Sequence, residues 1–250
     1  MLQQRYVSHD LTHFVGRSLK IERQRYLLLR KILRSGVLEA RPKIAGARRA
    51  SHYMLLTNPD VPLSTNQACV GSIACFCDIP LADLRIHMKK YSKFGLAFSK
   101  KFLANEGASP VIYVPSDGRP GLLPYEGYPG GRVAFQATAF DHFWKLINRV
   151  ETSIPEFKGS ARLTKPTDDL RKIFEFLKVH IISNLKFFDQ RLFDADAGNY
   201  YMEREWRVGR DIRFRLADVV RVIVPAKCGQ EFRRDFRRFR GEIIFADRPH

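Results

Sequence analysis

The alternation of apolar and polar positions predicts a strand and then a helix at the start of the chain. Residues 11–16, Leu-Thr-His-Phe-Val-Gly, predict a short strand, and residues 22–35 carry leucine and isoleucine at helical spacing. Gly36 follows this second pattern, as is common just after the last turn of a helix. We therefore expect a first strand followed by an amphipathic helix with one buried face.

The middle of the chain predicts shorter elements separated by long loops. Residues 71–77 are small and apolar, which favours a strand buried on both faces, and Asp78-Ile79-Pro80 then begins a helix that reaches Tyr91. We expect a strand at 94–98, a short helix to about residue 107, a strand at 110–115, and helices at 132–150 and from 167 to about 190. Residues 37–67, 116–131 and 152–166 are expected to be loops, because they lack periodicity and are basic or rich in proline and glycine.

The last third of the chain predicts mostly strands. We expect strands around Glu203 and Glu205, near Arg213, at 219–224 and at 242–246, with a basic helix at 230–239. Strands thus gather at both ends of the chain with helices between them, which is typical of an α+β domain with a mixed or mostly antiparallel sheet. We interpret residues 1–250 as one domain with a helical insertion at about 132–195. No strand leads into Gly-x-Gly-x-x-Gly or a P-loop, which argues against those nucleotide sites.

The charge of the chain is strongly unbalanced. It has 43 Lys and Arg against 26 Asp and Glu, a formal net charge of +17. A balance of this size indicates a polyanionic partner, most simply nucleic acid, with an acidic protein as the second option. A membrane surface is the third, because no basic cluster adjoins a long apolar helix.

The cysteines and the apolar runs point to a cytoplasmic protein. The Cys75-x-Cys77 spacing is not that of a zinc site, and no histidine pair accompanies it, so no metal site is expected. The thiols are interpreted as small buried groups in a reducing compartment. Residues 1–10 lack the apolar core of a signal peptide, and no run approaches the ~20 apolar residues of a membrane span.

The segment from Asn199 to Val208 concentrates the candidate chemistry. As a strand it would place Glu203, Glu205 and Arg207 on one face, since side chains two apart point the same way. Two interpretations remain open. The face is either an exposed polar surface neutralised by the arginine, or a pair of catalytic carboxylates at a cleft.

Other candidate side chains also have ordinary structural explanations. His13 lies on the first predicted strand, and a lone histidine there is usually structural; Arg17 nearby could be a surface residue. Tyr91 and Phe94 border the junction of a helix and a strand, where an aromatic ring could stack on a flat ligand or simply join the core.

Several motifs resemble the AbiGi abortive-infection family, which is linked to phage resistance and labelled an antitoxin. They extend over nearly the whole chain and match in order and spacing. The motifs are Leu-Thr-His-Phe-Val-Gly-Arg at 11–17, Cys-Phe-Cys-Asp-Ile-Pro at 75–80, His-Met-Lys-Lys-Tyr-Ser-Lys-Phe-Gly at 87–95, Pro-Val-Ile-Tyr-Val at 110–114 and Tyr-Tyr-Met-Glu-Arg-Glu-Trp-Arg-Val at 200–208.

The order of these motifs is also similar to the ADP-ribosyltransferase superfamily. The shared features are a histidine on the first strand, a strand leading into Phe-x-Asp, an aromatic after the next helix and a late Glu-x-Glu. This resemblance implies a split mixed or antiparallel sheet with inserted helices, and NAD as the substrate. The interval from Asp78 to Tyr91 is longer than the family pattern.

The second resemblance also implies roles for individual residues. Glu205 would stabilise the charge that develops on the ribose when the nicotinamide bond breaks, and Glu203 would orient or deprotonate the acceptor. His13 would hold the ribose, and Tyr91 or Phe94 would stack on nicotinamide. The remaining residues expected beside the NAD are Phe14 and Arg17.

Three functions follow as hypotheses. The leading one is a phage-defence toxin that transfers ADP-ribose from NAD to RNA or DNA and is restrained by a cognate antitoxin. The alternative is a non-catalytic antitoxin or a nucleic-acid-binding regulator of a toxin–antitoxin system. A metal-independent nuclease that uses His13 and Glu205 is the third.

The basic helix expected at 230–239 is the candidate nucleic-acid surface. Phe232, Phe236 and Phe239 recur at helical spacing and should face the sheet. The arginines would then flank this stripe or point outward, where they could contact phosphates. They are Arg233, Arg234, Arg237 and Arg238, with Arg240 just beyond.

Overall fold

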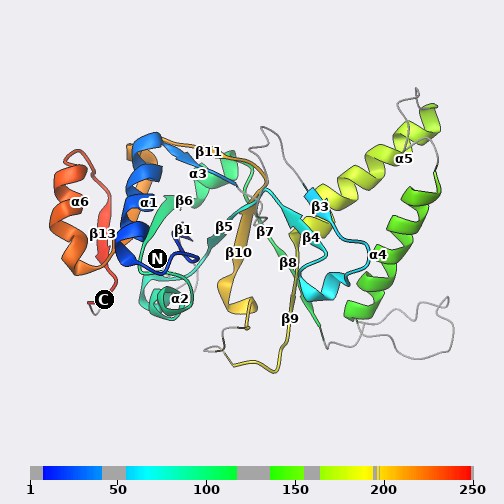
Figure 1. Ribbon diagram of the computed structural model, residues 1–250, viewed down its shortest axis with the longest axis horizontal. Helices are drawn as coiled ribbons and strands as arrows, with labels where there is room; N and C mark the ends of the chain where they lie inside the picture. The colour runs from blue at the N-terminus through cyan, green and yellow to red at the C-terminus, as the bar shows by residue number, and fades with distance from the viewer. Residues whose placement is uncertain are drawn as a thin grey trace, which may run out of the picture. The chain divides into compact units, whose positions relative to one another are not determined.

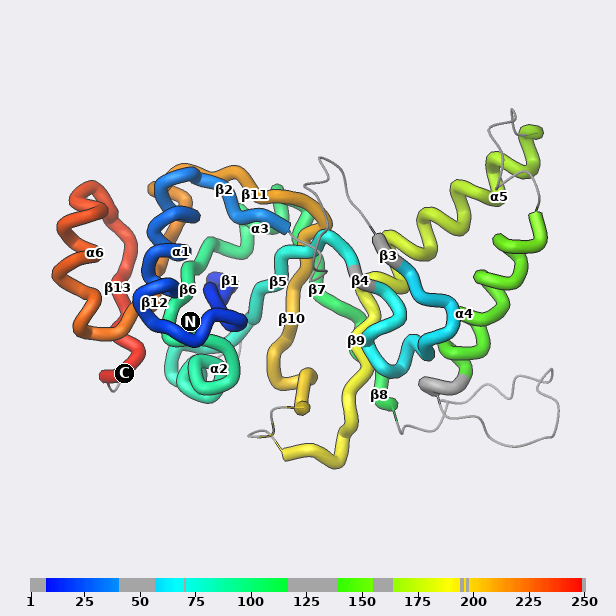
Figure 2. Tube along the Cα trace, in the orientation of Figure 1, coloured from blue at the N-terminus to red at the C-terminus, as the bar shows by residue number. Residues whose placement is uncertain are grey.

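The computed structural model describes residues 8–40, 55–116, 136–154, 164–193, 196 and 198–248. These residues form an α+β fold, as the sequence predicts, and group into two compact units. Unit 1 combines residues 1–41, 72–110 and 202–250, and unit 2 combines residues 42–71 and 111–201. Both ends of the described chain lie in unit 1 (Figure 2). The expectation of one domain with an insertion at about 132–195 stays a prediction.

Unit 1 is built on a seven-stranded sheet among the described residues (Figure 1). Its strands lie in the order β13-β12-β6-β1-β5-β10-β7, and all neighbours are antiparallel except the parallel pair β12 and β13. The bounds are β13 Glu242–Phe245, β12 Val219–Val224, β6 Gly95–Ser99, β1 Asp10–Phe14, β5 Ala74–Cys77, β10 Glu205–Val208 and β7 Ser109–Pro110. The strands that carry the sequence candidates, β1, β5 and β10, are therefore direct neighbours.

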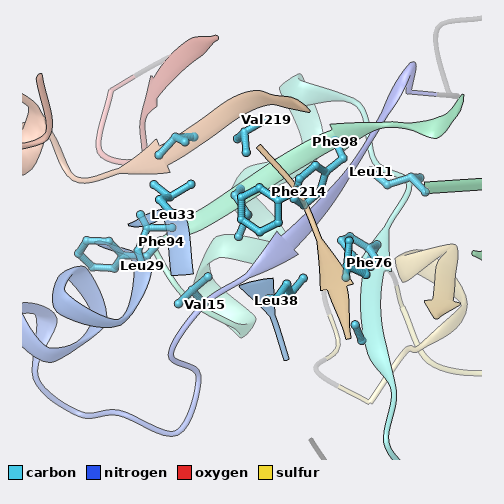
Figure 3. Packing of buried hydrophobic residues seen from close by; sticks show 14 of the residues in the cluster. Leu11, Val15, Leu29, Leu33, Leu38, Phe76, Phe94, Phe98, Phe214 and Val219 are labelled. Carbon is cyan, nitrogen blue, oxygen red and sulfur yellow. The ribbon is translucent and has the colours of Figure 1, made fainter. Parts of the chain in front are cut away.

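One face of this sheet carries helix α1, Glu22–Ser35. Its buried residues Tyr26, Leu29 and Leu33 recur at helical spacing, so a single stripe of the helix meets the sheet. The helix ends where Gly36 adopts φ 62°, a conformation that costs glycine little. Leu29 and Leu33 pack with side chains from several strands of the sheet in the main hydrophobic core (Figure 3).

The opposite face carries α2, Leu84–Lys90, which a 3₁₀ turn at Leu81–Asp83 precedes. Leu84 and Met88 are buried in a smaller cluster with Cys77, Ile79, Ile223 and Ile244. Alternate residues of a strand point to opposite faces. The two clusters therefore divide the side chains of the sheet between a large apolar core and a second face, where the polar residues described below lie.

The remaining elements of unit 1 are short. Helix α3 is Lys100–Asn105, and β2 Val37–Leu38 pairs with β11 Ile212–Arg213. Helix α6 spans Gly229–Asp235, so it ends before the predicted limit at residue 239. Phe236 leaves the helix at φ −131° and ψ 60°, and turns follow it.

Unit 2 consists of helices and two small sheets in its described part. Strand β3 Leu55–Thr57 pairs with β4 Cys69–Gly71, and β8 Ile112–Pro115 lies parallel to β9 Leu185–Phe188. Helices α4 Gln136–Ser153 and α5 Lys165–Phe176 follow the apolar pattern expected for this region. These two helices contribute Trp144, Ile147 and Phe174 to a hydrophobic core that is separate from the main core of unit 1.

Further elements depart from the sequence prediction. The helix expected from 167 to about 190 gives way to a π-helical turn at Leu177–Ile181 and then to β9, because parallel pairing with β8 satisfies its backbone and buries Leu185 and Phe187. The expected strand through Glu203 begins only at Glu205, since Glu203 ends a 3₁₀ turn, Tyr201–Glu203. The loop expected at 37–67 is wrong in its described part, because that part contains strands β2 and β3, whose pairing partners lie outside this segment. Most of the loops expected at 116–131 and 152–166 lies outside the described residues.

None of the helices in the described part of the chain is long and apolar enough to cross a membrane.

The aromatic core of unit 1 should dominate its stability. Phe98 has no exposed surface and contacts the rings of Phe76, Phe102 and Phe214. Phe98→Ala should lower the free energy of unfolding by about 3–5 kcal/mol, because the lost burial and the cavity add. Ile86→Ala, at a side chain 41% exposed, is the control and should change it by no more than about 0.5 kcal/mol. Equal effects in urea denaturation would contradict this packing.

Candidate functional site

Strand β10 brings Glu205 to the second face of the sheet. Glu205 lies opposite Cys77 of β5, and Cys77 lies opposite Thr12 of β1, so the three side chains project from one face. Glu205 is only 5% exposed, and its Oε1 accepts a hydrogen bond from Arg207 Nε at 2.8 Å. The two-residue spacing read from the sequence therefore pairs the acid with an arginine on the same strand.

Glu203 reaches the same region by a different backbone path. It ends the 3₁₀ turn, and the next residue, Arg204, has φ 41°, a left-handed conformation uncommon for arginine. Glu203 is 6% exposed. Its Oε1 accepts a hydrogen bond from Lys90 Nζ at 2.6 Å and another from the hydroxyl of Tyr91. A buried carboxylate needs such partners, and both come from the end of α2.

The ring of Tyr91 is enclosed on several sides. Phe14 stacks on it with ring centroids 5.7 Å apart, and His87 stacks at 6.5 Å. The guanidinium carbon of Arg17 lies 4.8 Å from the ring centroid, a cation–π contact. The structure therefore brings together Tyr91, Phe14, Arg17 and Glu203, four of the residues chosen from the sequence. We call these four residues, with Lys90 and His87, the Tyr91 cluster.

Burial and charge shift the ionisation of groups on this face. Burial, together with the negative Glu203, raises the pKa of Tyr91, so its hydroxyl keeps its proton and donates it to the carboxylate. Burial likewise raises the pKa of the Cys77 thiol, and Glu203 adds to the effect. Burial lowers the pKa of His87, which Glu203 partly opposes. The tyrosine, thiol and imidazole all favour their neutral forms here.

His13 does not join this face. Neighbouring residues of a strand point to opposite sides, and Thr12 occupies the side of Glu205. His13 Nδ1 instead lies 2.8 Å from the carbonyl oxygen of Cys75, and its ring is 5.6 Å from that of Phe76 in the main core. Burial lowers the pKa of His13, so the neutral imidazole is favoured.

Phe94 belongs to the core. It is 0% exposed and packs in the main hydrophobic cluster, so its ring presents no surface to a ligand in this structure. The resemblance to ADP-ribosyltransferases implies that His13, Phe94 and Glu205 all contact one NAD molecule, but the structure does not bring the three side chains together. Glu205 is on one face of the sheet, while His13 and Phe94 pack toward the other. The catalytic roles suggested for these residues stay predictions.

Two charged residues near the site are not among the candidates predicted from the sequence. Lys90 is the cation that pairs with Glu203, and it directly precedes Tyr91 in the motif at 87–95. Asp78 pairs with Lys100 at 2.7 Å and accepts the backbone N–H of Ser8 at 3.0 Å. An acid placed directly after a buried strand, as in Cys-Phe-Cys-Asp, was the available signal for Asp78.

The arginines predicted to contact nucleic acid lie apart from the Tyr91 cluster in the sequence, on α6 and the turns after it. Phe232 and Phe236 are buried, as the apolar stripe predicts. Arg233, Arg234, Arg237 and Arg238 are all exposed.

The Tyr91 cluster combines one acid, Glu203, with the cations Lys90 and Arg17 and with the rings of Tyr91, Phe14 and His87. Among the described residues, no group of three or more histidine, cysteine, aspartate or glutamate side chains could hold a metal ion. Glu203 and Glu205 have separate cationic partners, Lys90 and Arg207. Such an arrangement can stabilise the fold through paired buried charges. It can also present a carboxylate to a cationic or hydroxyl-bearing ligand if Lys90 or Arg207 moves away from its glutamate.

The Lys90–Glu203 pair can be tested by a double-mutant cycle. Glu203→Gln should lower the free energy of unfolding by about 3–5 kcal/mol, because it removes the negative charge that faces the buried Lys90 ammonium. Lys90→Met combined with Glu203→Gln should cost less than the two single changes added together. Lys89→Met, at an exposed neighbour, serves as the control. Strict additivity in urea denaturation would mean that the two groups do not interact.

The lowered pKa values of two histidines predict that the protein is less stable in acid. His87 and His13 have lowered pKa values, so below about pH 6.5 the unfolded chain binds more protons than the folded one. Stability should therefore be full above this pH and fall as the pH decreases. His87→Gln should flatten this fall, because it removes one of the two groups that take up protons on unfolding. Thermal unfolding between pH 7.5 and 5 measures the difference, and identical profiles for wild type and His87→Gln would exclude a contribution from His87.

Comparison with known proteins places the sequence of this chain in a family. A family model described as "Putative abortive phage resistance protein AbiGi, antitoxin" matches residues 63–234. A protein named "Abortive phage resistance protein AbiGi" from Lactococcus lactis subsp. cremoris is 42% identical over 73 residues, which cover 27% of this chain and 28% of the relative. The match thus spans little more than a quarter of that relative's length. No solved structure matches the chain significantly. The family model includes α2, β10 and most of α6, and the chain therefore belongs to the AbiGi family of abortive phage resistance proteins.

Proposed function

We propose that this chain is the antitoxin component of a phage-defence system and restrains a toxin protein. The observation that carries the proposal is the family match over residues 63–234, whose description names an antitoxin. The similar protein from Lactococcus lactis bears the name of an abortive phage resistance protein. In this proposal restraint occurs by binding of the toxin, a role that requires no catalytic site.

The charges of the candidate site fit this proposal. Glu203 is hydrogen-bonded to Lys90 and Tyr91, and Glu205 to Arg207, so both carboxylates are buried with cations close by. Paired charges of this kind fix the positions of the elements that carry them. In an antitoxin these contacts would hold α2 and β10 in place, and the surface of unit 1 would bind the partner.

A second candidate function is supported by one feature of the sheet. Strands β1, β5 and β10 are neighbours, and they carry His13, the Cys-Phe-Cys-Asp motif and Glu205, in the order that the resemblance to ADP-ribosyltransferases implies. The register between β1 and β5 comprises a single pair, Thr12 with Cys77, which is compatible with a sheet that splits there. Under this proposal Glu205 would act on NAD and a nucleic acid would accept the ADP-ribose.

A genetic experiment tests the antitoxin proposal. Deleting the chain from its native bacterium should stop growth, because the toxin is then unrestrained, and supplying the chain from a plasmid should restore growth. Glu205→Gln should restore growth as well as wild type does when expressed at an equal level, since restraint needs no catalytic carboxylate. A deletion strain that grows normally would refute the proposal.

The same variant tests the second candidate in a host that lacks the system. An ADP-ribosyltransferase should slow growth and deplete cellular NAD on expression, and Glu205→Gln should remove both effects, since loss of one electrostatic stabiliser typically costs about 10²–10³ in rate. An antitoxin should be harmless and leave NAD unchanged. Val220→Ala, at a side chain 37% exposed, is the matched control and should behave as wild type.

A further inference from the structure

The segment from Gln230 to Arg240 buries its aromatic residues and exposes its arginines. Phe232 is 0% exposed, Phe236 is 8% exposed, and Phe239 packs against the same core. The ring of Phe232 lies 5.0 Å from that of Phe236 and 5.5 Å from that of Phe239. These contacts fix the orientation of the segment, so its outward side chains hold a defined position.

Both acids of this segment interact with helix α1. Glu231 pairs with Arg23 at 2.6 Å, and Asp235 accepts a hydrogen bond from the hydroxyl of Tyr26 at 2.9 Å. Asp235 also lies 3.6 Å from Arg34. The negative charges of the segment are therefore used to anchor α6 to α1 and do not neutralise the outward arginines.

The outward side of the segment carries five arginines, which we name the arginine face. All five are exposed, and none forms an ion pair with any acid in the described part of the chain. They are Arg233, Arg234, Arg237, Arg238 and Arg240. A surface with five unpaired positive charges close together in sequence attracts a polyanion.

The composition of the arginine face distinguishes between possible polyanions. Protein interfaces have an apolar or aromatic centre from which charges are depleted. No large apolar side chain among the described residues from 229 onward is strongly exposed, so such a centre is missing here. Arginine instead offers a planar donor fork that binds phosphate oxygens in pairs. The face therefore fits nucleic acid better than an acidic protein.

The length of α6 indicates how the nucleic acid is recognised. The helix has seven residues and turns follow it, so it is shorter than the recognition helices that read bases in the major groove. Contacts to phosphates alone carry no sequence information. We propose that the arginine face binds the phosphate backbone of nucleic acid without sequence specificity. This inference goes beyond the proposed function, because such binding requires no toxin.

Salt-dependent binding of the full-length chain tests the proposal. Fluorescence anisotropy with labelled RNA and duplex DNA of random sequence should give affinities that fall steeply between about 50 and 200 mM salt. Arg234→Gln combined with Arg238→Gln should weaken binding and reduce the log–log salt slope by roughly one unit for each arginine. Binding should be similar for unrelated sequences.

A charge-matched variant provides the control. Lys145→Gln with Arg149→Gln removes two exposed positive charges from α4 and lowers the net charge by the same amount. This variant should retain the wild-type salt slope, since only the location of the charges differs. Thermal unfolding of both variants shows whether they remain folded.

Three results would overturn the proposal. The first is an arginine-face variant that binds with wild-type affinity and slope. The second is an equal loss of binding in the α4 control, which would mean that only the net charge matters. The third is poly-L-glutamate that competes as strongly as nucleic acid at equal charge, which would identify an acidic-protein surface. None of these results depends on growth in the deletion strain, so this proposal and the antitoxin proposal can fail separately.

Discussion

The burial of the Glu203 carboxylate places the strictest condition on unit 1. A carboxylate that is 6% exposed is costly unless a cation and hydrogen-bond donors reach it. Lys90 and Tyr91 meet this condition together, although Tyr91 and Glu203 are 112 residues apart in the chain. The end of α2 must therefore lie against the turn that precedes β10. Phe14 of β1 packs on the same tyrosine and brings a third element into the arrangement.

The backbone at Arg204 separates the two glutamates. On a continuous strand, Glu203 and Glu205 would share one face and repel each other in a medium of low polarity. The left-handed conformation at Arg204, φ 41°, lets Glu203 leave the strand geometry and meet Lys90, while Glu205 stays on β10 with Arg207. Each buried acid thus has its own cation. Conformational strain of order 1–3 kcal/mol at such a residue is tolerable when the Lys90–Glu203 ion pair and the hydrogen bond from Tyr91 depend on it.

The sequence predicts elements that local interactions define better than elements that depend on contacts between residues far apart in the chain. Helix α1 was predicted at its observed bounds, because local periodicity and a following glycine define it. Strand β9 was predicted as helix, since its identity depends on pairing with β8, which lies far earlier in the chain. Glu203 and Tyr91 were chosen from their residue types, and the structure brings them together. Lys90 was missed, because a lysine on a helix is usually solvated and only the fold shows that it reaches a buried acid. His13 is predicted beside the same ligand as Glu205, but Thr12 lies on the Glu205 face, and a shift of one residue along a strand moves a side chain to the other face.

The location of the acids explains how a net charge of +17 becomes a localised surface feature. Glu203 and Glu205 are buried with cations, while Glu231 and Asp235 turn toward α1. The acids of α6 therefore contribute to its attachment, and the arginines beside them keep their full field. Uncompensated positive charge destabilises a compact chain by self-repulsion. A bound polyanion would relieve that repulsion, and a ligand that binds only the folded state stabilises it by mass action. The same distribution of charge therefore has two consequences: the acids of α6 attach it to α1, and its exposed arginines are left to bind a polyanion.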